Sequence, residues 1–277
     1  SLSTFWQELL KNLNGEATQG DHPEVMSPAF EKRNGPKMSV LDIVSLFRQV
    51  LHKKLLPASW QGPITWAGDA PATDASHDTQ VKMAKLQGEA WAKVCSRAKE
   101  HGVTPHAALM TGLLKAWAEV YQDEPALESA TPINCRHMCD PPVPNNEMGN
   151  FVGSYNPTWR RKEIEKTEFW TFAQRYQVQL RANKRESAKQ VFQLDFLKPY
   201  PEAYCDFWKD KRKNRMGRTG GLELSDLGRI NLPTQDKPWT IREIYFCQSA
   251  QTCTTALGVN TATAADAMHA TFCWQRG

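Results

Sequence analysis

Polar side chains interrupt several runs of residues that otherwise read as buried β-strands. A strand that buries one face has no favourable place for an amide, a guanidinium or a hydroxyl unless that group lines a site or is bonded locally. One run, 132–136, ends in Asn134 and Arg136, and another, 148–155, carries two glycines and ends in Tyr155. Because glycine lets a backbone turn or approach a ligand closely, the second run is also a candidate for ligand contact.

Further runs of this kind lie in the C-terminal part of the chain. Residues 224–228 place a serine, an aspartate and a glycine on one strand, and residues 246–249 end in polar residues that face a polar pair on a neighbouring run. Each group has two readings: it lines a substrate tunnel, or it is a strand polar group bonded to its local neighbours. The candidates are Ser225, Asp226, Gly228, Gln248, Ser249, Asn260 and Thr261.

The histidines form no catalytic motif with a nearby carboxylate in the sequence. None has an aspartate four residues later, and His137, with Asp140 three residues on, is interpreted as a structural or surface histidine. No Ser-His-Asp or Cys-His constellation stands out, so covalent catalysis is not favoured, although a nucleophile at Cys135 or Cys247 remains an alternative. The seven histidines are His22, His52, His77, His101, His106, His137 and His269.

The cysteines indicate a reducing compartment. They are seven, an odd number, and most stand in apolar strand-like or helical surroundings, so we expect buried free thiols. Cys135 and Cys139 flank His137, but no Cys-x-x-Cys spacing and no second pair accompany them. The sequence therefore predicts no metal site.

Composition and charge exclude some classes of protein. The 277 residues are 40% hydrophobic and 23% charged, without an apolar run that approaches the roughly 20 residues needed to span a bilayer. We expect a cytoplasmic location, with the surface of endomembranes as an alternative. The net charge of +4 is too small to indicate nucleic acid binding. The basic run 209–215 is interpreted as a solvated helix end, with binding of an anionic cofactor phosphate as the alternative and nucleic acid after it.

Hydrophobic periodicity predicts a mixed α/β chain that ends in a mostly antiparallel or mixed sheet. Thr104 followed by Pro105 is a strong helix start, because threonine caps a first turn and proline fits the first helical position. We expect helices over 3–13, 40–51, the stretch that ends at Gly102, the stretch that starts at Pro105, 168–186 and 201–215, and strands over 80–86, 130–136, 150–156, 222–230, 239–249, 254–263 and 268–274.

The opening helix carries one broad apolar face, which predicts that it packs against a core. Termini are usually loose, so such a start indicates a missing upstream segment; ordinary disordered chain ahead of Ser1 is the alternative. Residues 63–74 are rich in Pro, Ala, Gly and Asp and read as a linker. We place the main boundary there, with 1–74 as the remainder of an N-terminal subdomain plus crossover linker and 75–277 as a C-terminal subdomain.

The polar strand runs, in this order and together with the helix pair around residues 102–104 and the opening helix, resemble the fungal alcohol acetyltransferase-like family. This family is a branch of the chloramphenicol acetyltransferase-like superfamily, which also holds plant acyltransferases and the condensation domains of peptide synthetases. The resemblance implies an α/β (α+β) fold: a two-subdomain sandwich of mixed sheets flanked by helices, with the N-terminal subdomain incomplete here. Relatives continue into a final helix where this chain closes on a strand, so both ends are expected to be cut.

The resemblance also implies a site. The family's general base is the His of a His-x-x-x-Asp-Gly motif that precedes a helix like 3–13; this chain has no such motif, so no catalytic residue is assigned in it. A tunnel between the subdomains admits an acyl-CoA from one side and an acceptor from the other. By analogy, Ser225, Asp226 and Gly228 lie near the pantetheine arm or thioester, Gln248, Ser249, Asn260 and Thr261 line the tunnel, and Asn134, Arg136 and Tyr155 face it from the other side.

The implied reaction is direct acyl transfer. The missing histidine would deprotonate the acceptor while a hydroxyl or amide donor stabilises the oxyanion. Acetyl-CoA or another acyl-CoA is then co-substrate, no cofactor is needed, and the acceptor is a hydrophobic alcohol, or an amine, of secondary metabolism. Alternatives are a condensation-type domain with a carrier-bound donor, a non-catalytic binding module, and a chain whose companion polypeptide supplies the histidine. Relatives tend to have Asn where Asp226 stands, so donation from this side chain to substrate is in doubt.

Overall fold

A mixed eight-stranded sheet organises the part of the chain that the computed structural model describes, which is residues 2–16, 28–55, 57, 60, 62–69, 78–213, 217–218, 220–231, 237–248 and 255–275. The strand order is β1-β3-β6-β7-β8-β2, with β4 and β5 also paired to β3. The strands are β1 (Thr65–Trp66), β2 (Thr79–Gln87), β3 (Ala126–Asn134), β4 (Val152–Tyr155), β5 (Thr158–Arg160), β6 (Gly220–Arg229), β7 (Thr255–Ala264) and β8 (Ala267–Gln275).

The sheet is parallel at its centre and antiparallel at one side. Strand β6 runs parallel to both β3 and β7, whereas β8 is antiparallel to β7 and to β2. Most of the predicted strands are confirmed, and the mixed α/β class is correct. The helices are α1 (Leu2–Leu13), α2 (Val40–Leu55), α3 (Gly88–Glu100), α4 (Pro105–Val120), α5 (Arg161–Lys166), α6 (Phe169–Lys189) and α7 (Glu202–Arg212), with short 3₁₀ turns at Phe30–Lys32, Arg136–Met138 and Gln190–Phe196.

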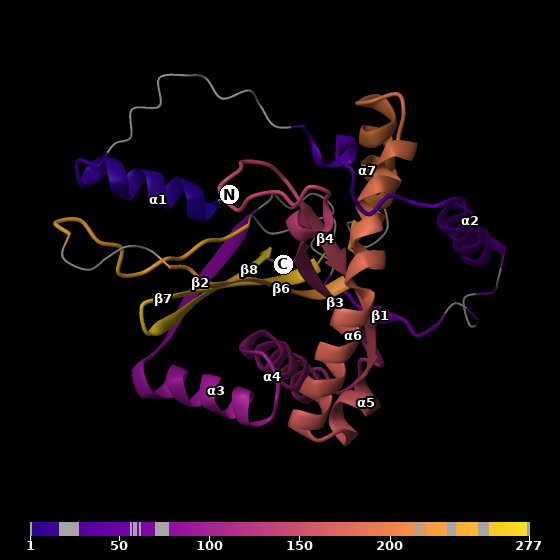
Figure 1. Ribbon diagram of the computed structural model, residues 1–277. Coiled ribbons are helices and arrows are strands. Elements are labelled where there is room, and N and C mark those ends of the chain that lie inside the picture. Colours follow the sequence, from indigo (N-terminus) through magenta and orange to yellow (C-terminus); the bar gives the residue numbers. More distant parts are fainter. Residues whose placement is uncertain are drawn as a thin grey trace.

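Helices α3 and α4 cover one face of the sheet, and α6 stands beside them (Figure 1). The start of α4 is as predicted: the Thr104 side chain accepts a hydrogen bond from the Ala107 N–H, and Pro105 is the first helical residue. Its buried residues repeat at helical spacing and join the main core under β3 and β6. This packing fixes the first turn of α4 against the sheet.

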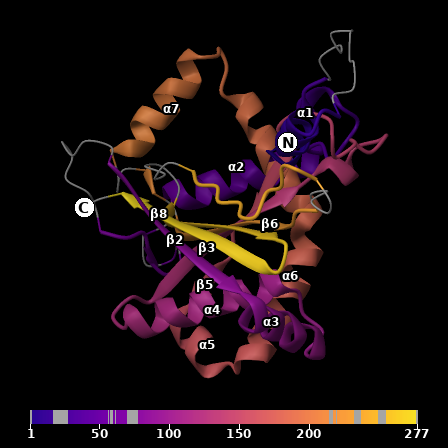
Figure 2. The ribbon, with the colours of Figure 1, turned by 90° about the vertical axis from the view of Figure 1, so that its left-hand side faces the viewer.

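Residues 237–248 lie on the other face of the sheet, and α1 lies beyond them (Figures 1 and 2). The predicted strand over 239–249 is wrong, because residues 239–248 pair with no strand of the described chain. They are held by side chains instead. Ile244 and Phe246 pack on Ala262 and Ala264 of β7, and the Phe246 carbonyl accepts a hydrogen bond from Thr271. Alternating apolar residues therefore reflect a covering segment rather than a strand.

The apolar faces of α1 and α2 are largely exposed in the described chain. Leu10 of α1 is buried, but Phe5 and Leu13 are 54% and 48% exposed. In α2, Val44 and Phe47 are 58% and 59% exposed, and Figure 2 shows the helix behind the sheet. The prediction that the opening helix packs against a core holds for Leu10 but not for Phe5 and Leu13, because the apolar stripe of the helix is wider than the contact it makes. None of the helices in the described ranges is long and apolar enough to cross a membrane.

Candidate functional site

The site begins where two neighbouring strands separate. Strands β3 and β6 are paired only at Ser129↔Leu222 and Ala130↔Glu223. Beyond this point β3 pairs with β4, while β6 pairs with β7, so the carboxyl halves of two adjacent parallel strands diverge. In open α/β sheets, ligands bind outside the carboxyl ends of strands where neighbours part in this way.

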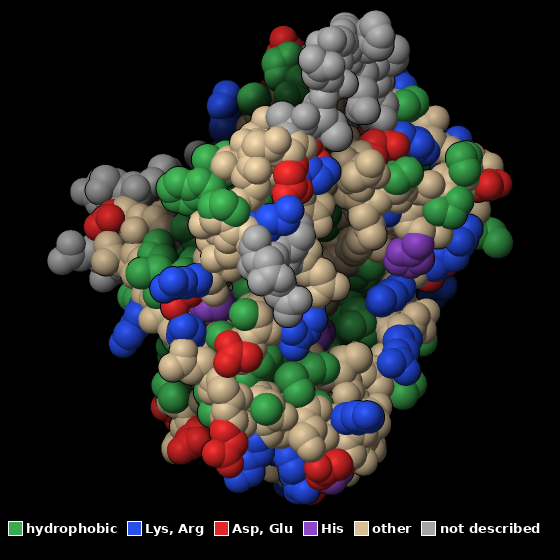
Figure 3. All heavy atoms as spheres, turned by 60° about the vertical axis from the view of Figure 1, so that its left-hand side comes forward, with side chains coloured by type: hydrophobic (Ala, Val, Ile, Leu, Met, Phe, Trp, Pro, Cys, Tyr) green, Lys and Arg blue, Asp and Glu red, His purple; other side chains and the backbone are tan. Residues whose placement is uncertain are grey.

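A cavity of about 460 Å³ fills the gap between the diverging strands; we call it the inter-strand cavity. Residues 131–134 of β3 form one wall and residues 226–228 of β6 form the other, while the first turn of α4 and one face of α6 close it. Arg181 and Lys184 of α6 and His137 line its rim, and neither cation of α6 has an ion-pair partner among the described residues. The face drawn in Figure 3 is hollowed, and Lys and Arg side chains surround the hollow.

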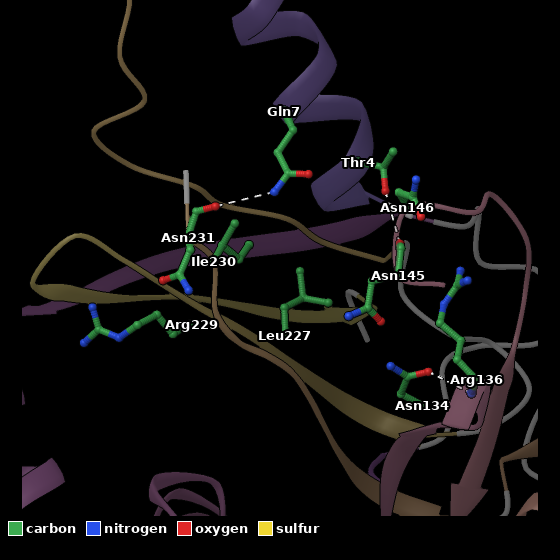
Figure 4. Close-up of a pocket in the computed structure, with 10 residues that line it drawn as sticks. All are labelled: Thr4, Gln7, Asn134, Arg136, Asn145, Asn146, Leu227, Arg229, Ile230 and Asn231. Carbon is green, nitrogen blue, oxygen red and sulfur yellow. Dashed lines mark hydrogen bonds between the residues drawn. The ribbon is translucent and has the colours of Figure 1, made fainter. Parts of the chain in front are cut away.

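A second cavity of about 590 Å³, here called the α1 cavity, lies between α1 and the ends of β3 and β6 (Figure 4). Helix α1 is fastened over it by hydrogen bonds from Thr4 to the Asn145 carbonyl and from Gln7 to the Asn231 carbonyl. Asn134 and Leu227 line both this cavity and the inter-strand cavity. The two cavities therefore meet across these two side chains.

A hydrogen-bond chain that runs from half-buried to buried side chains forms the floor of the inter-strand cavity. The Asp226 carboxylate lies 3.3 Å from Nδ1 of His106, Nε2 of His106 lies 3.2 Å from the Tyr176 hydroxyl, and that hydroxyl lies 2.5 Å from Oγ1 of Thr131. With an ionised Asp226, Nδ1 of His106 carries the proton, Nε2 accepts from Tyr176, and Tyr176 accepts from Thr131. Each donor of the chain then has an acceptor, and all the hydrogen bonds point from Thr131 toward Asp226.

Asp226 is held ionised by its surroundings. Burial raises its pKa, but hydrogen bonds from His106 and from the Gly228 N–H outweigh burial, so the pKa of Asp226 lies below its ordinary value. The Thr261 hydroxyl also donates to it, at 3.0 Å, and the Gly228 N–H donates at 2.8 Å. Burial raises the pKa of the Tyr176 phenol, so this group stays protonated. The site thus contains a half-buried carboxylate with three donors.

Comparison with known families identifies the fold's relatives. The family model described as alcohol acetyltransferase matches residues 29–273. The chain belongs to this family. A search of curated protein sequences finds no significant match.

Several solved structures share the fold of this alcohol acetyltransferase family member. The TRI3 trichothecene 15-O-acetyltransferase from Fusarium sporotrichioides matches with a TM-score of 0.59 and 11% identity, over 99% of this chain and 58% of its own length. F. graminearum TRI101, solved with coenzyme A and deoxynivalenol, matches with a TM-score of 0.57 and 16% identity, over 99% of this chain and 60% of its own length. The EpoB cyclization-docking bidomain from Sorangium cellulosum matches with a TM-score of 0.59 and 14% identity, over 100% of this chain and 52% of its own length. The chain thus spans a little over half the length of these proteins.

The predicted tunnel residues do not all face one cavity. Successive residues of a strand point to opposite faces, so Asp226 and its partner Thr261 face α4, whereas Ser225 and its partner Asn260 face the covering segment 237–248. Asn260 is bonded to Thr271 and Cys273 within the sheet. Asn260 is therefore bonded locally, and its place in a tunnel stays a prediction.

Residues on the β3 side also divide. Asn134 lines both cavities, but Arg136 is buried and donates to the Pro144 and Gly149 carbonyls, with its guanidinium 4.7 Å from the Phe151 ring centroid. Arg136 therefore fastens the loop after β3, even though it borders the α1 cavity. Tyr155 is buried beside Tyr176, with ring centroids 6.4 Å apart, so it packs behind the site.

The remaining candidates fall at or beyond the edge of the site. Gly228 lies at a register shift of β6 with φ of +66°, where glycine is favoured, and lines the inter-strand cavity. Gln248 is exposed on the covering segment, outside the strands that were expected to carry it. Ser249 lies outside the described residues. Their place in a tunnel stays a prediction.

The basic run and the cysteines agree with the simpler interpretations, with one correction. Lys209 and Lys213 pair with Asp206 and Asp210 one turn away, on an exposed helix end. Cys135 is buried, and burial raises its pKa to about 11, which does not suit a nucleophile. The expectation of buried thiols is wrong for Cys205 and Cys247, which are exposed.

Sequence reasoning missed His106 and Tyr176. His106 is the second residue of α4, and Asp226 lies on β6, so no local spacing links the two. A usable signal did exist: an aspartate within an apolar strand requires a donor, and a histidine beside a strong helix start is a candidate. Only the packing of α4 against β6 shows that the two meet.

Proposed function

We propose that this chain is the larger, C-terminal portion of an acyl-CoA-dependent acyltransferase that transfers an acetyl or other acyl group to the hydroxyl of a hydrophobic alcohol. The observation that carries the proposal is the pair of cavities at the strand gap, which meet across Asn134 and Leu227. Two substrates can approach such a junction from opposite sides. Direct transfer requires this arrangement, because no covalent intermediate carries the acyl group between sites.

The donor is assigned to the inter-strand cavity. Its rim carries Arg181, Lys184 and His137, which suit the phosphates of an acyl-CoA, whereas the acceptor would enter the α1 cavity. Solved relatives support a CoA donor, because TRI101 was solved with coenzyme A and with deoxynivalenol or T-2 mycotoxin. The same family likeness supports our proposal of an acetyl donor and a secondary-metabolite acceptor, and the cysteine usage supports a cytoplasmic location.

The general base is assigned to the His-x-x-x-Asp-Gly segment of the family, in the same polypeptide or a companion chain. Thr4, in the first turn of α1, lines the α1 cavity, so a segment that leads into α1 would approach the junction. Its neutral histidine would take the acceptor proton as the oxygen attacks the thioester carbonyl, and would return it to the departing thiolate.

Asn134 is the proposed oxyanion donor. Its Oδ1 accepts from the Arg136 N–H at 3.1 Å, which orients the amide and leaves the NH₂ group toward the cavities (Figure 4). Removal of one such donor lowers kcat by about 10²- to 10³-fold in acyl-transfer enzymes. Asn183 of α6 is a matched control, because its amide donates to the Gln179 carbonyl on an exposed helix face.

The test uses the protein with its His-x-x-x-Asp-Gly segment, acetyl-CoA and a panel of hydrophobic alcohols, with free thiol as the readout. We expect turnover by the wild type and by Asn183→Ala, and a loss of about 10²-fold in kcat for Asn134→Ala. Turnover only with a carrier-bound donor would favour a condensation-type domain, whose fold the EpoB bidomain shares. Ligand binding without turnover by any donor would indicate a non-catalytic binding module and refute the proposal.

A further inference from the structure

A bulge near the end of β6, between Asp226 and Arg229, lies where three cavities of this protein approach one another. The register of β6 with β7 shifts between Asp226 and Arg229. Leu227 lines the inter-strand and α1 cavities, while Gly228 lines the inter-strand cavity and a third cavity of about 290 Å³ beside α3. Arg229 lines the α1 cavity and that third cavity. The conformation of these few residues therefore shapes the boundaries of all three of these cavities.

Asp226 holds this bulge in place. Its Oδ1 accepts from the Gly228 N–H at 2.8 Å, which closes a local turn around Leu227, and from the Thr261 hydroxyl at 3.0 Å, which ties the turn to β7. Its Oδ2 faces His106, which is fixed in turn by Tyr176. The carboxylate thus joins the bulge to α4 and to β7 at once.

Leu227 is free to act as a partition. The side chains of the bulge's neighbours are anchored, but Leu227 is 43% exposed and belongs to none of the buried clusters of the described chain. Opposite it stands Asn134, which also borders both cavities, and Figure 4 shows Leu227 between Asn134 and the α1 side of the site. An apolar side chain at such a junction limits what can pass from one cavity into the other.

We propose that Leu227 is a specificity-determining residue that limits the size of the acyl group crossing between the two cavities, and that Asp226 is the positioning residue that holds it there. This inference rests on the proposed function and adds the residue that selects the substrate. A shorter side chain at 227 opens the junction, and a larger one closes it. Loss of the Asp226 carboxylate releases the turn around Leu227 and weakens the discrimination between short and long acyl groups.

The test compares acetyl-CoA with octanoyl-CoA as donors, using the protein with its upstream segment. For Leu227→Ala we expect the ratio of kcat/KM for octanoyl over acetyl donor to rise at least about tenfold, since pocket contacts of this size discriminate by roughly 10- to 200-fold. For Leu227→Phe we expect the ratio to fall. Val120→Ala, at the exposed end of α4, is the control and leaves the ratio unchanged.

Asp226 is tested by a matched pair. Asn retains an oxygen that accepts from the Gly228 N–H, so Asp226→Asn should keep the wild-type ratio of kcat/KM for octanoyl over acetyl donor. Asp226→Ala lacks this oxygen, so its ratio should shift toward that of Leu227→Ala. The Gly228 amide exchanges slowly with solvent in the wild type and in Asp226→Asn, and fast in Asp226→Ala. If Asp226→Ala does not fold, the Leu227 variants and the exchange of Asp226→Asn still decide the matter.

The outcomes separate this inference from the proposed function. If the wild type turns over but the octanoyl-to-acetyl ratio of kcat/KM does not change in opposite directions for Leu227→Ala and Leu227→Phe, only the role of Leu227 as a partition is overturned. Without turnover, the same ratio is read from dissociation constants for the two acyl-CoAs, so the proposed reaction fails while the partition is still judged. Absence of any acyl-CoA binding overturns both, and a Gly228 amide that exchanges equally in all Asp226 variants overturns the positioning role.

Discussion

The hydroxyl of Tyr176 is the central link of the buried chain, and its removal gives a measurable prediction. Tyr176 is fully buried, and its hydroxyl bonds to Nε2 of His106 at 3.2 Å and to Oγ1 of Thr131 at 2.5 Å. Tyr176→Phe removes both bonds and leaves both partners without a replacement. Neutral hydrogen bonds contribute about 1 kcal/mol each, and a buried group left unsatisfied costs about 1–3 kcal/mol. We therefore expect the free energy of unfolding to fall by about 2–3 kcal/mol.

Tyr155 offers the matched control for this substitution. It is also a buried tyrosine, its ring lies beside that of Tyr176, and burial raises its pKa, but its hydroxyl has no hydrogen-bond partner in the described chain. Tyr155→Phe should change the free energy of unfolding by less than about 0.5 kcal/mol. Urea unfolding at neutral pH, followed by tryptophan fluorescence and by circular dichroism, measures both variants. Equal losses for the two variants would refute the hydrogen-bond chain.

Other perturbations give simpler expectations. Gly228→Ala should lower the free energy of unfolding by about 1 kcal/mol, because φ is +66° at this residue. Gly112→Ala lies in the interior of α4, where an added Cβ meets no atom within 4 Å apart from the helix's own backbone. It should be neutral or stabilising by up to about 1 kcal/mol in the same unfolding assay. Folding lowers the pKa of Asp226, so its ionised carboxylate contributes fully to the free energy of unfolding above the ordinary pKa of 3.8. This contribution is lost as the pH falls through the lower folded-state pKa, so the difference in free energy of unfolding between wild type and Asp226→Asn should shrink in acid titrations. In native protein, the exposed thiols of Cys205 and Cys247 should react with a disulfide reagent at pH 8 before Cys135, whose pKa is about 11; prior loss of Cys135 in peptide mapping would contradict the packing of β3.

Local patterns predict the elements of this fold because they are set by nearest neighbours. The cap at Thr104 with Pro105 and the apolar stripe of α4 depend on residues within a few turns, and the structure confirms them. Residues 239–248 show where this reasoning ends. Their apolar residues satisfy the pattern of a strand, but a strand also needs a backbone partner, and β7 and β8 already pair with each other. Partner availability is a property of the whole sheet.

The candidate site was predicted in part, for a similar reason. The polar runs of β3 and β6 are indeed the walls of the inter-strand cavity. Their alternation was not applied across the paired strands, so Ser225 and Asn260 were grouped with Asp226 and Thr261 although the two pairs occupy opposite faces. The strand period could have separated them without a structure. The divergence of β3 from β6, which opens the cavity, could not be read from either strand alone.

Asp226 and His106 are best understood as one feature. A carboxylate that is only 16% exposed costs several kcal/mol to desolvate unless donors surround it, and three donors do so here. The family likeness implies an asparagine at this position, which needs no charged partner. An aspartate can stand there only if a neighbour supplies a proton on the facing side, and His106 in the first turn of α4 does so. The same carboxylate accepts from the Gly228 N–H in the turn that carries Leu227. Loss of the whole side chain, unlike its exchange for asparagine, should therefore change both the local electrostatics and the proposed substrate selection at this bulge.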